Sequence, residues 1–212
     1  MKITWTKTPR WVKLLFNNLV WDLPNTHQKV YLTFDDGPIP VVTEWVLDLL
    51  KSENVKATFF CIGDNIQKHP EIYQRILTEG HQIGNHTFNH LNGWKTPTKE
   101  YLYNIQICEN EMERMANNSK KLFRPPFGKI TLNQSKALQN LGYKIIMWDV
   151  ISYDYNRAVT PEECLKNVVV KSAQGSIIVF HDSLKAEKNL KYALPKAIHF
   201  LKNNGFNFDV LS

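Results

Sequence analysis

From residue 30 onward, short apolar runs alternate along the chain with segments in which apolar residues recur at helical spacing. The run Val30–Phe34, for example, precedes apolar residues at 42, 45, 46, 49 and 50, a spacing typical of one helix face. Seven runs are predicted to be strands: Val30–Phe34, Val55–Cys61, His81–Asn85, Leu122–Phe123, Tyr143–Trp148, Ile177–Phe180 and Phe206–Leu211. Because strands and helices alternate, the pattern indicates a parallel sheet with helices outside it. We expect a closed or nearly closed α/β barrel, with a doubly wound open sheet as the alternative.

Helix boundaries are marked by residues that favour particular backbone conformations. Gly80, Gly142 and Gly205 each precede a predicted strand, and glycine accepts the left-handed conformation that often ends a helix. Pro70 stands where a first helical turn is expected, and residues 160–163 have the Thr-x-x-Glu form of a capping box. These signals support the alternation of helices and strands.

The first 27 residues do not follow this alternation. Their apolar stretch at 14–16 is too short for a signal-peptide core, and no run in the chain reaches the ~18 apolar residues of a membrane span. One predicted helix face carries Trp11, Leu14, Leu15 and Leu19. We therefore expect an N-terminal extension, 1–27, packed on a catalytic domain at 28–212. A weak peripheral contact with a membrane surface is the alternative.

Composition narrows the class of protein further. A chain of 212 residues suits one domain. The net charge of +6 comes from basic residues scattered along the chain, which favours a solvated surface over a nucleic-acid face. Three widely spaced cysteines argue against a disulfide framework and for a reducing compartment. Together with the lack of a recognised signal peptide, this favours the cytoplasm. The sequence carries no trace of an oligomeric state.

Polar residues follow five of the predicted strands. In parallel α/β folds the functional site lies at the carboxyl ends of the strands. The polar residues at these ends are Asp35, Asp36, His86, His90, Arg124, Trp148, Asp149, Asp154, Tyr155, His181 and Asp182. Each fragment alone has a structural explanation, since Asp-Asp-Gly-Pro, for instance, also suits a tight turn. Their joint occurrence at strand ends predicts a site.

These residue types suit metal-assisted hydrolysis. Catalytic zinc favours two imidazoles and a carboxylate, with a position left open for water. His86 and His90 supply the imidazoles, and either Asp35 or Asp36 supplies the carboxylate. The other aspartate is then free to act as a base toward water. A bound metal acidifies water and polarises a carbonyl, which suits the cleavage of an amide or ester.

Three further groups complete this chemistry. His181 is placed to protonate the leaving group, oriented by Asp154 or by Asp182. Arg124 would hold the base carboxylate ionised and in place.

Four motifs together resemble a known family. Thr-Phe-Asp-Asp-Gly-Pro stands at 33–38, His-Thr-Phe-Asn-His at 86–90, Arg-Pro-Pro-Phe at 124–127 and His-Asp at 181–182. The chain resembles the polysaccharide deacetylases of the NodB-homology type, the fourth carbohydrate esterase family, over residues 28–211. The resemblance implies a single-domain distorted (β/α)7 barrel. It also implies a bound metal, zinc or in some members cobalt or another divalent ion.

The resemblance implies a role for each residue of the site. Asp36, His86 and His90 would be the metal ligands. Asp35 would be the general base, positioned by Arg124. His181 would be the general acid, supported by Asp154. The expected substrate-binding residues are Phe127, through its backbone N–H at the oxyanion, together with Tyr155, Trp148 and Val179.

Two positions depart from the family pattern. Tyr155 stands where the family often has tryptophan, and Val179 where leucine is frequent. Both changes bear on the sugar groove and the acetyl pocket, and neither removes a catalytic group.

The predicted function is metal-dependent removal of acetyl groups from N-acetylated sugars in oligo- or polysaccharides, either chitooligosaccharide-like or peptidoglycan-like. An esterase for O-acetyl glycans of the xylan type would use the same residues. A catalytically silent sugar-binding homologue is a third hypothesis, and the intact set of catalytic residues speaks against it. A structural zinc barrel would need a fourth ligand, and the sequence offers no obvious one near the set.

Overall fold

The computed structural model describes residues 5–23, 28–115 and 120–212, and its centre is a parallel sheet. The strands, in chain order, are β1 (Lys29–Asp35), β2 (Thr58–Cys61), β3 (Gln82–Asn85), β4 (Leu122–Phe123), β5 (Lys144–Ile145), β6 (Val150–Ile151), β7 (Ile177–His181) and β8 (Asn207–Phe208). The first two strands are buried along nearly their whole length. Their continuous apolar character follows from cover on both faces.

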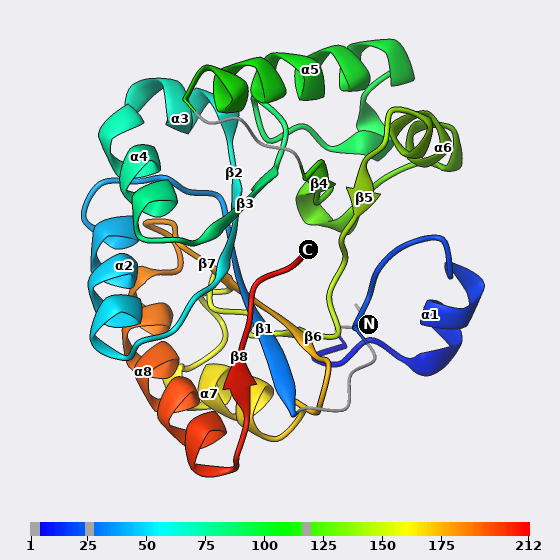
Figure 1. The fold of residues 1–212 in the computed structure, drawn as a ribbon. Helices are drawn as coiled ribbons and strands as arrows, with labels where there is room; N and C mark the ends of the chain where they lie inside the picture. Colours follow the sequence, from blue (N-terminus) through cyan, green and yellow to red (C-terminus); the bar gives the residue numbers. More distant parts are fainter. Residues whose placement is uncertain (1–4, 24–27, 116–119) are drawn as a thin grey trace.

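The strand order is β5-β4-β3-β2-β1-β7-β6, and every neighbouring pair is parallel. Strands β1 to β5 follow one another around the sheet, which is the order of a barrel, whereas a doubly wound sheet reverses direction part-way. The short β8 pairs with the start of β1. The sheet curls into a half-barrel surrounded by helices, which confirms the predicted distorted (β/α)7 fold (Figure 1).

The structure shortens one predicted strand and adds a second strand after it. The run at 143–148 was expected to be a single strand, but β5 covers only Lys144–Ile145, and β6 follows at Val150–Ile151. The two short strands lie at opposite ends of the strand order. An apolar run does not reveal the point where the chain leaves one edge of the sheet for the other.

Helices cover the outside of the sheet (Figure 1). The α-helices are α1 (Arg10–Leu15), α2 (Val42–Ser52), α3 (Gly63–Lys68), α4 (Pro70–Thr78), α5 (Thr98–Met115), α6 (Leu132–Asn140), α7 (Pro161–Val169) and α8 (Glu187–Asn203), and the 3-10 turns are η1 (Gly93–Lys95) and η2 (Pro126–Gly128). The largest core lies between the strands and α2, α4, α7 and α8. Phe34 stacks on Phe59 at its centre, with ring centroids 5.0 Å apart.

The predicted helix boundaries are confirmed. Gly80, Gly142 and Gly205 all have positive φ, of 76°, 85° and 79°. Pro70 occupies the first turn of α4, and Thr160 with Glu163 forms a reciprocal capping box at the start of α7.

The N-terminal segment lies between the two edge strands. The Val20 N–H donates to the Ile145 carbonyl, and the Met147 N–H donates to the Val20 carbonyl, at 2.9 and 2.7 Å. On the other side, Lys7 forms an isolated bridge with Val150. The backbone N–H and C=O groups on the outer edges of β5 and β6 are thereby hydrogen-bonded to residues 6–20.

Three of the four residues on the apolar face predicted for the N-terminal helix are exposed, and the fourth, Leu19, packs beyond the end of α1 against the core cluster that contains Tyr101 and Phe123. Within α1 the buried residue is Val12, while Trp11, Leu14 and Leu15 are 59%, 65% and 67% exposed. The expected division at residues 27 and 28 falls beside residues 24–27, which lie outside the described ranges, so it stays a prediction. Among the described residues, no helix is both long and apolar enough to cross a bilayer.

Candidate active site and metal centre

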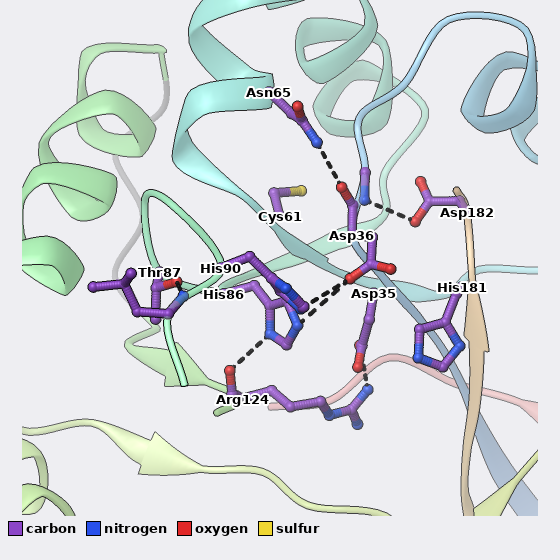
Figure 2. Close-up of polar contacts among 12 residues, drawn as sticks. Asp35, Asp36, Cys61, Asn65, His86, Thr87, His90, Arg124, His181 and Asp182 are labelled. Atoms are coloured by element: carbon purple, nitrogen blue, oxygen red, sulfur yellow. Dashed lines mark hydrogen bonds and ion pairs between the residues drawn. The ribbon is translucent and has the colours of Figure 1, made fainter. Parts of the chain in front are cut away.

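The predicted catalytic residues converge at the carboxyl ends of the strands. Asp35 ends β1 and His181 ends β7, and the register of these two strands pairs them directly. His86 follows β3, and Arg124 follows β4. Figure 2 shows these side chains pointing toward one another around the two aspartates.

Arg124 anchors Asp35. The guanidinium is fully buried and donates to the Asp35 carboxylate at 2.7 Å and to the Thr33 hydroxyl at 2.8 Å. It also donates to the carbonyls of Ile146 and Met147. Burial works to raise the pKa of Asp35, but the charge of Arg124, with that of His181, holds that pKa below its usual value. Asp35 is therefore an ionised carboxylate in a nearly dry site.

Asp36, His86 and His90 form a cluster with metal-ligand geometry. One ligand atom from each of the three residues lies within 4.8 Å of the others. The Nε2 atoms of His86 and His90 are 3.8 and 3.3 Å from Oδ1 of Asp36 (Figure 2). That oxygen is buried and has no hydrogen-bond partner among the described residues. A buried carboxylate oxygen facing two imidazole nitrogens is costly without a cation, so the residues fit a metal ion.

The surroundings of the imidazoles prepare them as ligands. His86 Nδ1 lies 2.7 Å from the carbonyl oxygen of Arg124. Because a carbonyl only accepts, Nδ1 carries the proton and Nε2 keeps its lone pair. Burial lowers the pKa of His86 to about 4 and also lowers that of His90. Both imidazoles are therefore neutral near pH 7, as metal binding requires.

The backbone of Asp36 is held in an unusual conformation. Its φ is +88°, a region that non-glycine residues rarely adopt. Asn65 donates its amide to the Asp36 carbonyl at 2.7 Å. On the other side, the Gly37 N–H donates to Asp182 at 3.1 Å. A Cβ on Gly37 would lie 2.0 Å from that carboxylate, so the close approach requires glycine.

Asp154 orients His181. Its carboxylate lies 2.8 Å from His181 Nδ1 and accepts from the His181 backbone N–H at 2.7 Å. Burial disfavours charge on the imidazole, but Asp154 outweighs it and raises the pKa of His181 to about 9. Asp182, the other predicted candidate for this role, bonds Thr43 and Gly37 instead.

The expected substrate-binding residues are in different environments. Phe127 has φ +60° and is 59% exposed, with its ring 4.5 Å from that of His90. The Tyr155 ring meets His181 edge-on at 4.6 Å. Trp148 is half-buried and packs so closely on Gly128 that a Cβ there would lie 2.6 Å from the indole. Val179 is fully buried beside Thr33, so its contact with a substrate stays a prediction.

A family model described as polysaccharide deacetylase matches residues 22–146. The chain belongs to the polysaccharide deacetylase family. Over 189 residues it is 40% identical to a peptidoglycan-N-acetylglucosamine deacetylase of Bacillus cereus, covering 89% of this chain and 68% of that relative. Over 179 residues it is 34% identical to chitin deacetylase 2 of Saccharomyces cerevisiae, covering 82% of this chain and 56% of the yeast protein.

A solved structure extends this similarity to the fold. The crystal structure of the Bc1960 peptidoglycan N-acetylglucosamine deacetylase, in complex with a small benzamide, has a TM-score of 0.88 and 37% sequence identity. The match covers 96% of this chain and 95% of that one. Membership of the family, with the Asp/His/His cluster, indicates a metal-dependent hydrolase.

The structure adds three residues to the site of this polysaccharide deacetylase that the sequence did not single out. Thr33 bonds Arg124, Asn65 holds the Asp36 carbonyl, and Thr43 donates to Asp182 at 2.6 Å. Thr33 lies in the first motif, which was a usable signal. Asn65 and Thr43 lie on helices α3 and α2, and nothing in their local sequence marks them.

Proposed function

We propose that this protein is a zinc-dependent N-deacetylase that hydrolyses the acetamido group of N-acetylglucosamine units within a glycan. The family relationship supports the reaction, and two of the relatives are named for deacetylation of peptidoglycan and chitin. The observation that carries the proposal is the buried Asp36 oxygen, which faces two neutral imidazoles and has no hydrogen-bond partner among residues 5–23, 28–115 and 120–212. It lies beside an aspartate that a buried arginine holds in place.

The donor set fits zinc. Two imidazole nitrogens and one carboxylate are the usual protein ligands of a catalytic zinc ion, which keeps a position open. When bound, the ion supplies Lewis-acid chemistry, since it lowers the pKa of water and polarises a carbonyl. Asp36, His86 and His90 would hold it.

Asp35 is the base of the proposed reaction. Its pKa is held low by Arg124, so it is ionised and available to accept a proton as water attacks the acetyl carbon. The guanidinium fixes one carboxylate oxygen and leaves the other to face the reacting water.

Two groups stabilise the negative charge that develops on the oxyanion and on the departing amine. The Phe127 N–H makes no hydrogen bond within the described parts of the chain and is placed to donate to the oxyanion, a contact typically worth about 3 kcal/mol. His181, held protonated by Asp154, donates a proton to the departing amine. The products are acetate and a free amino sugar.

The first experiment measures acetate release from N-acetylglucosamine oligomers. The protein is stripped with a chelator and then given back zinc. We expect release to stop on stripping and to return with the metal. If a folded protein that has bound zinc releases no acetate from these oligomers, the proposed reaction is wrong, and release from O-acetylated xylan instead would identify an esterase.

Replacing the base gives a second prediction. Asp35→Asn keeps the size of the side chain but removes the proton acceptor, so we expect kcat to fall by about 10²–10⁴-fold. Zinc affinity, measured by competition with a chromophoric chelator, should stay close to wild type because Asp35 is outside the ligand set. Near-normal turnover by this variant would contradict the assignment of Asp35 as the base.

A further inference from the structure

An open cavity of about 650 Å³ lies next to the catalytic pair of Asp154 and His181. Six residues from 154–161 and six from 184–191 line it, Asp154 among them. Asn189 joins its two walls, because the buried amide donates to the carbonyls of Asp154 and Val159 at 3.1 and 3.0 Å. Hydrogen bonds therefore hold the two walls of the cavity together, and the cavity lies beside Asp154. None of the steps proposed for the reaction assigns a role to it.

Positive charge gathers around this cavity. Its cationic side chains are Arg157, Lys185, Lys188 and Lys191. The two carboxylates in its lining already bind partners, since Glu187 pairs with Lys191 at 2.6 Å and Asp154 with His181.

The three remaining cationic side chains are not used in ion pairs within the described chain. No carboxylate of the described chain lies within ion-pair distance of Arg157, Lys185 or Lys188. All three are exposed. Lys188 acts at longer range on Glu162, whose pKa it helps to lower. Cations gathered in a concave site attract anionic ligands.

One aromatic ring connects this cluster with the reaction centre. The edge-on contact of Tyr155 with His181 has a centroid distance of 4.6 Å. The Lys185 ammonium lies 5.5 Å from the centroid of the same tyrosine ring. Lys185 and His181 thus both contact the Tyr155 ring, which places the cationic side of the cavity beside the reaction centre.

We propose that this cavity is a subsite for a carboxylate-bearing substituent on the sugar adjacent to the one that is deacetylated. Arg157 stands on one wall, and Lys185 and Lys188 stand on the other, an arrangement that suits several carboxylates spread along a flexible substituent. The preferred substrate is then an anionic N-acetylated glycan, such as one with acidic peptides on alternate sugars, over a neutral glycan such as chitin. The inference rests on the proposed deacetylation.

The test compares three tetrasaccharides of N-acetylated sugars. One is neutral, one carries peptide substituents with free carboxylates, and the third carries the same peptides with the carboxylates amidated. We expect the wild type to have the lowest KM for the acidic substrate, and that KM should rise with salt as the charges are screened. Amidation should raise KM while leaving kcat unchanged.

Charge-removing variants locate the effect. Arg157→Gln and Lys185→Gln should each lower the ratio of kcat/KM for the acidic substrate to kcat/KM for the amidated one by about two- to fivefold, the range expected for one exposed ion pair. Lys185→Gln combined with Lys188→Gln should lower it by roughly tenfold. Lys51→Gln, an exposed lysine on α2 outside the cavity, is the matched control and should leave the ratio unchanged.

The outcomes separate this inference from the proposed function. Equal kcat/KM for acidic and amidated substrates, or equal losses on both in the cavity variants, would overturn the subsite while leaving the deacetylase intact. Absence of acetate release from all three substrates by the zinc-loaded protein would overturn the proposed reaction itself.

Discussion

Asp36 carries the carboxylate of the metal cluster on a left-handed backbone, and its neighbours hold it there. Asn65 fixes the carbonyl, and Asp182 fixes the next N–H. Groups that orient a ligand typically affect metal affinity by 10–100-fold. Ligand geometry at this site therefore depends on two residues that do not contact the ion.

Removal of one of these contacts gives a prediction. We expect Asn65→Ala to weaken zinc binding by about tenfold, measured by competition with a chromophoric chelator. Gln67→Ala, on the exposed side of the same helix, is the control and should bind as wild type does. Unchanged affinity in Asn65→Ala would show that the backbone keeps its conformation without the amide.

The contact between Asp154 and His181 predicts a pH effect. Because Asp154 raises the pKa of His181 to about 9, the general acid stays protonated until the pH approaches that value. Asp154→Asn removes the charge, so the alkaline limb of the kcat/KM profile should move to lower pH. Asp64→Asn, a change on an ion-paired surface residue, should leave the limb in place. If the limb does not move in Asp154→Asn, it belongs to a group other than His181.

The sequence predicted which residues meet at the site but not all of their partners. Strand ends and motif spacing placed Asp35, His86 and His181 correctly, because parallel strands bring their carboxyl ends to one edge. The choice between Asp154 and Asp182 stayed open from the residues alone. It depends on the path of the loop after β6, which no local pattern records.

At the scale of elements, the segment at 6–22 lies between the two edges of the sheet, and ion pairs with Asp149 hold it there. This carboxylate is 3% exposed and binds Lys7 at 2.8 Å, Lys13 at 2.5 Å and the Ser176 hydroxyl at 2.5 Å. Burial works to raise the pKa of Asp149, but these partners lower it. The carboxylate therefore connects the N-terminal segment with the start of β6 and the start of β7.

Asp149→Ala should lower the free energy of unfolding by about 2 kcal/mol at pH 7, since it leaves buried partners without their acceptor. Because the folded-state pKa is below the unfolded one, this contribution is complete at neutral pH and is lost as the pH falls through the folded-state pKa. Urea denaturation at pH 7 and in acid measures both effects. Asp22→Ala, which removes an exposed partner of Lys13, is the control and should cost less than about 1 kcal/mol. Equal losses in the two variants would contradict this role.

Helical spacing at the N-terminus predicted an apolar face of the helix but not whether that face would be buried. Trp11, Leu14 and Leu15 do share one side of α1, yet that side is open, and Val12 makes the buried contact. Periodicity reports where apolar residues lie on a helix. It carries no information on which side the rest of the chain will cover.

At the scale of the whole molecule, the alternation of strands and helices was enough to predict the barrel. The glycine and capping signals added the helix ends, because each acts through local backbone geometry. The gap between β5 and β6 could not be predicted, since it is closed by pairing between residues far apart in the sequence.

That pairing joins segments that are synthesised at different times. Lys7 and Asp149 are separated by 142 positions. At a synthesis rate of about 5–20 residues per second, the N-terminal segment emerges from the ribosome roughly 7–28 s before its partner does. During this interval Val12, Leu19 and Val20, which pack in the folded protein, have no barrel edge to join. The growing chain is therefore most open to capture by chaperones, or by another copy of itself, until β6 and β7 have been synthesised.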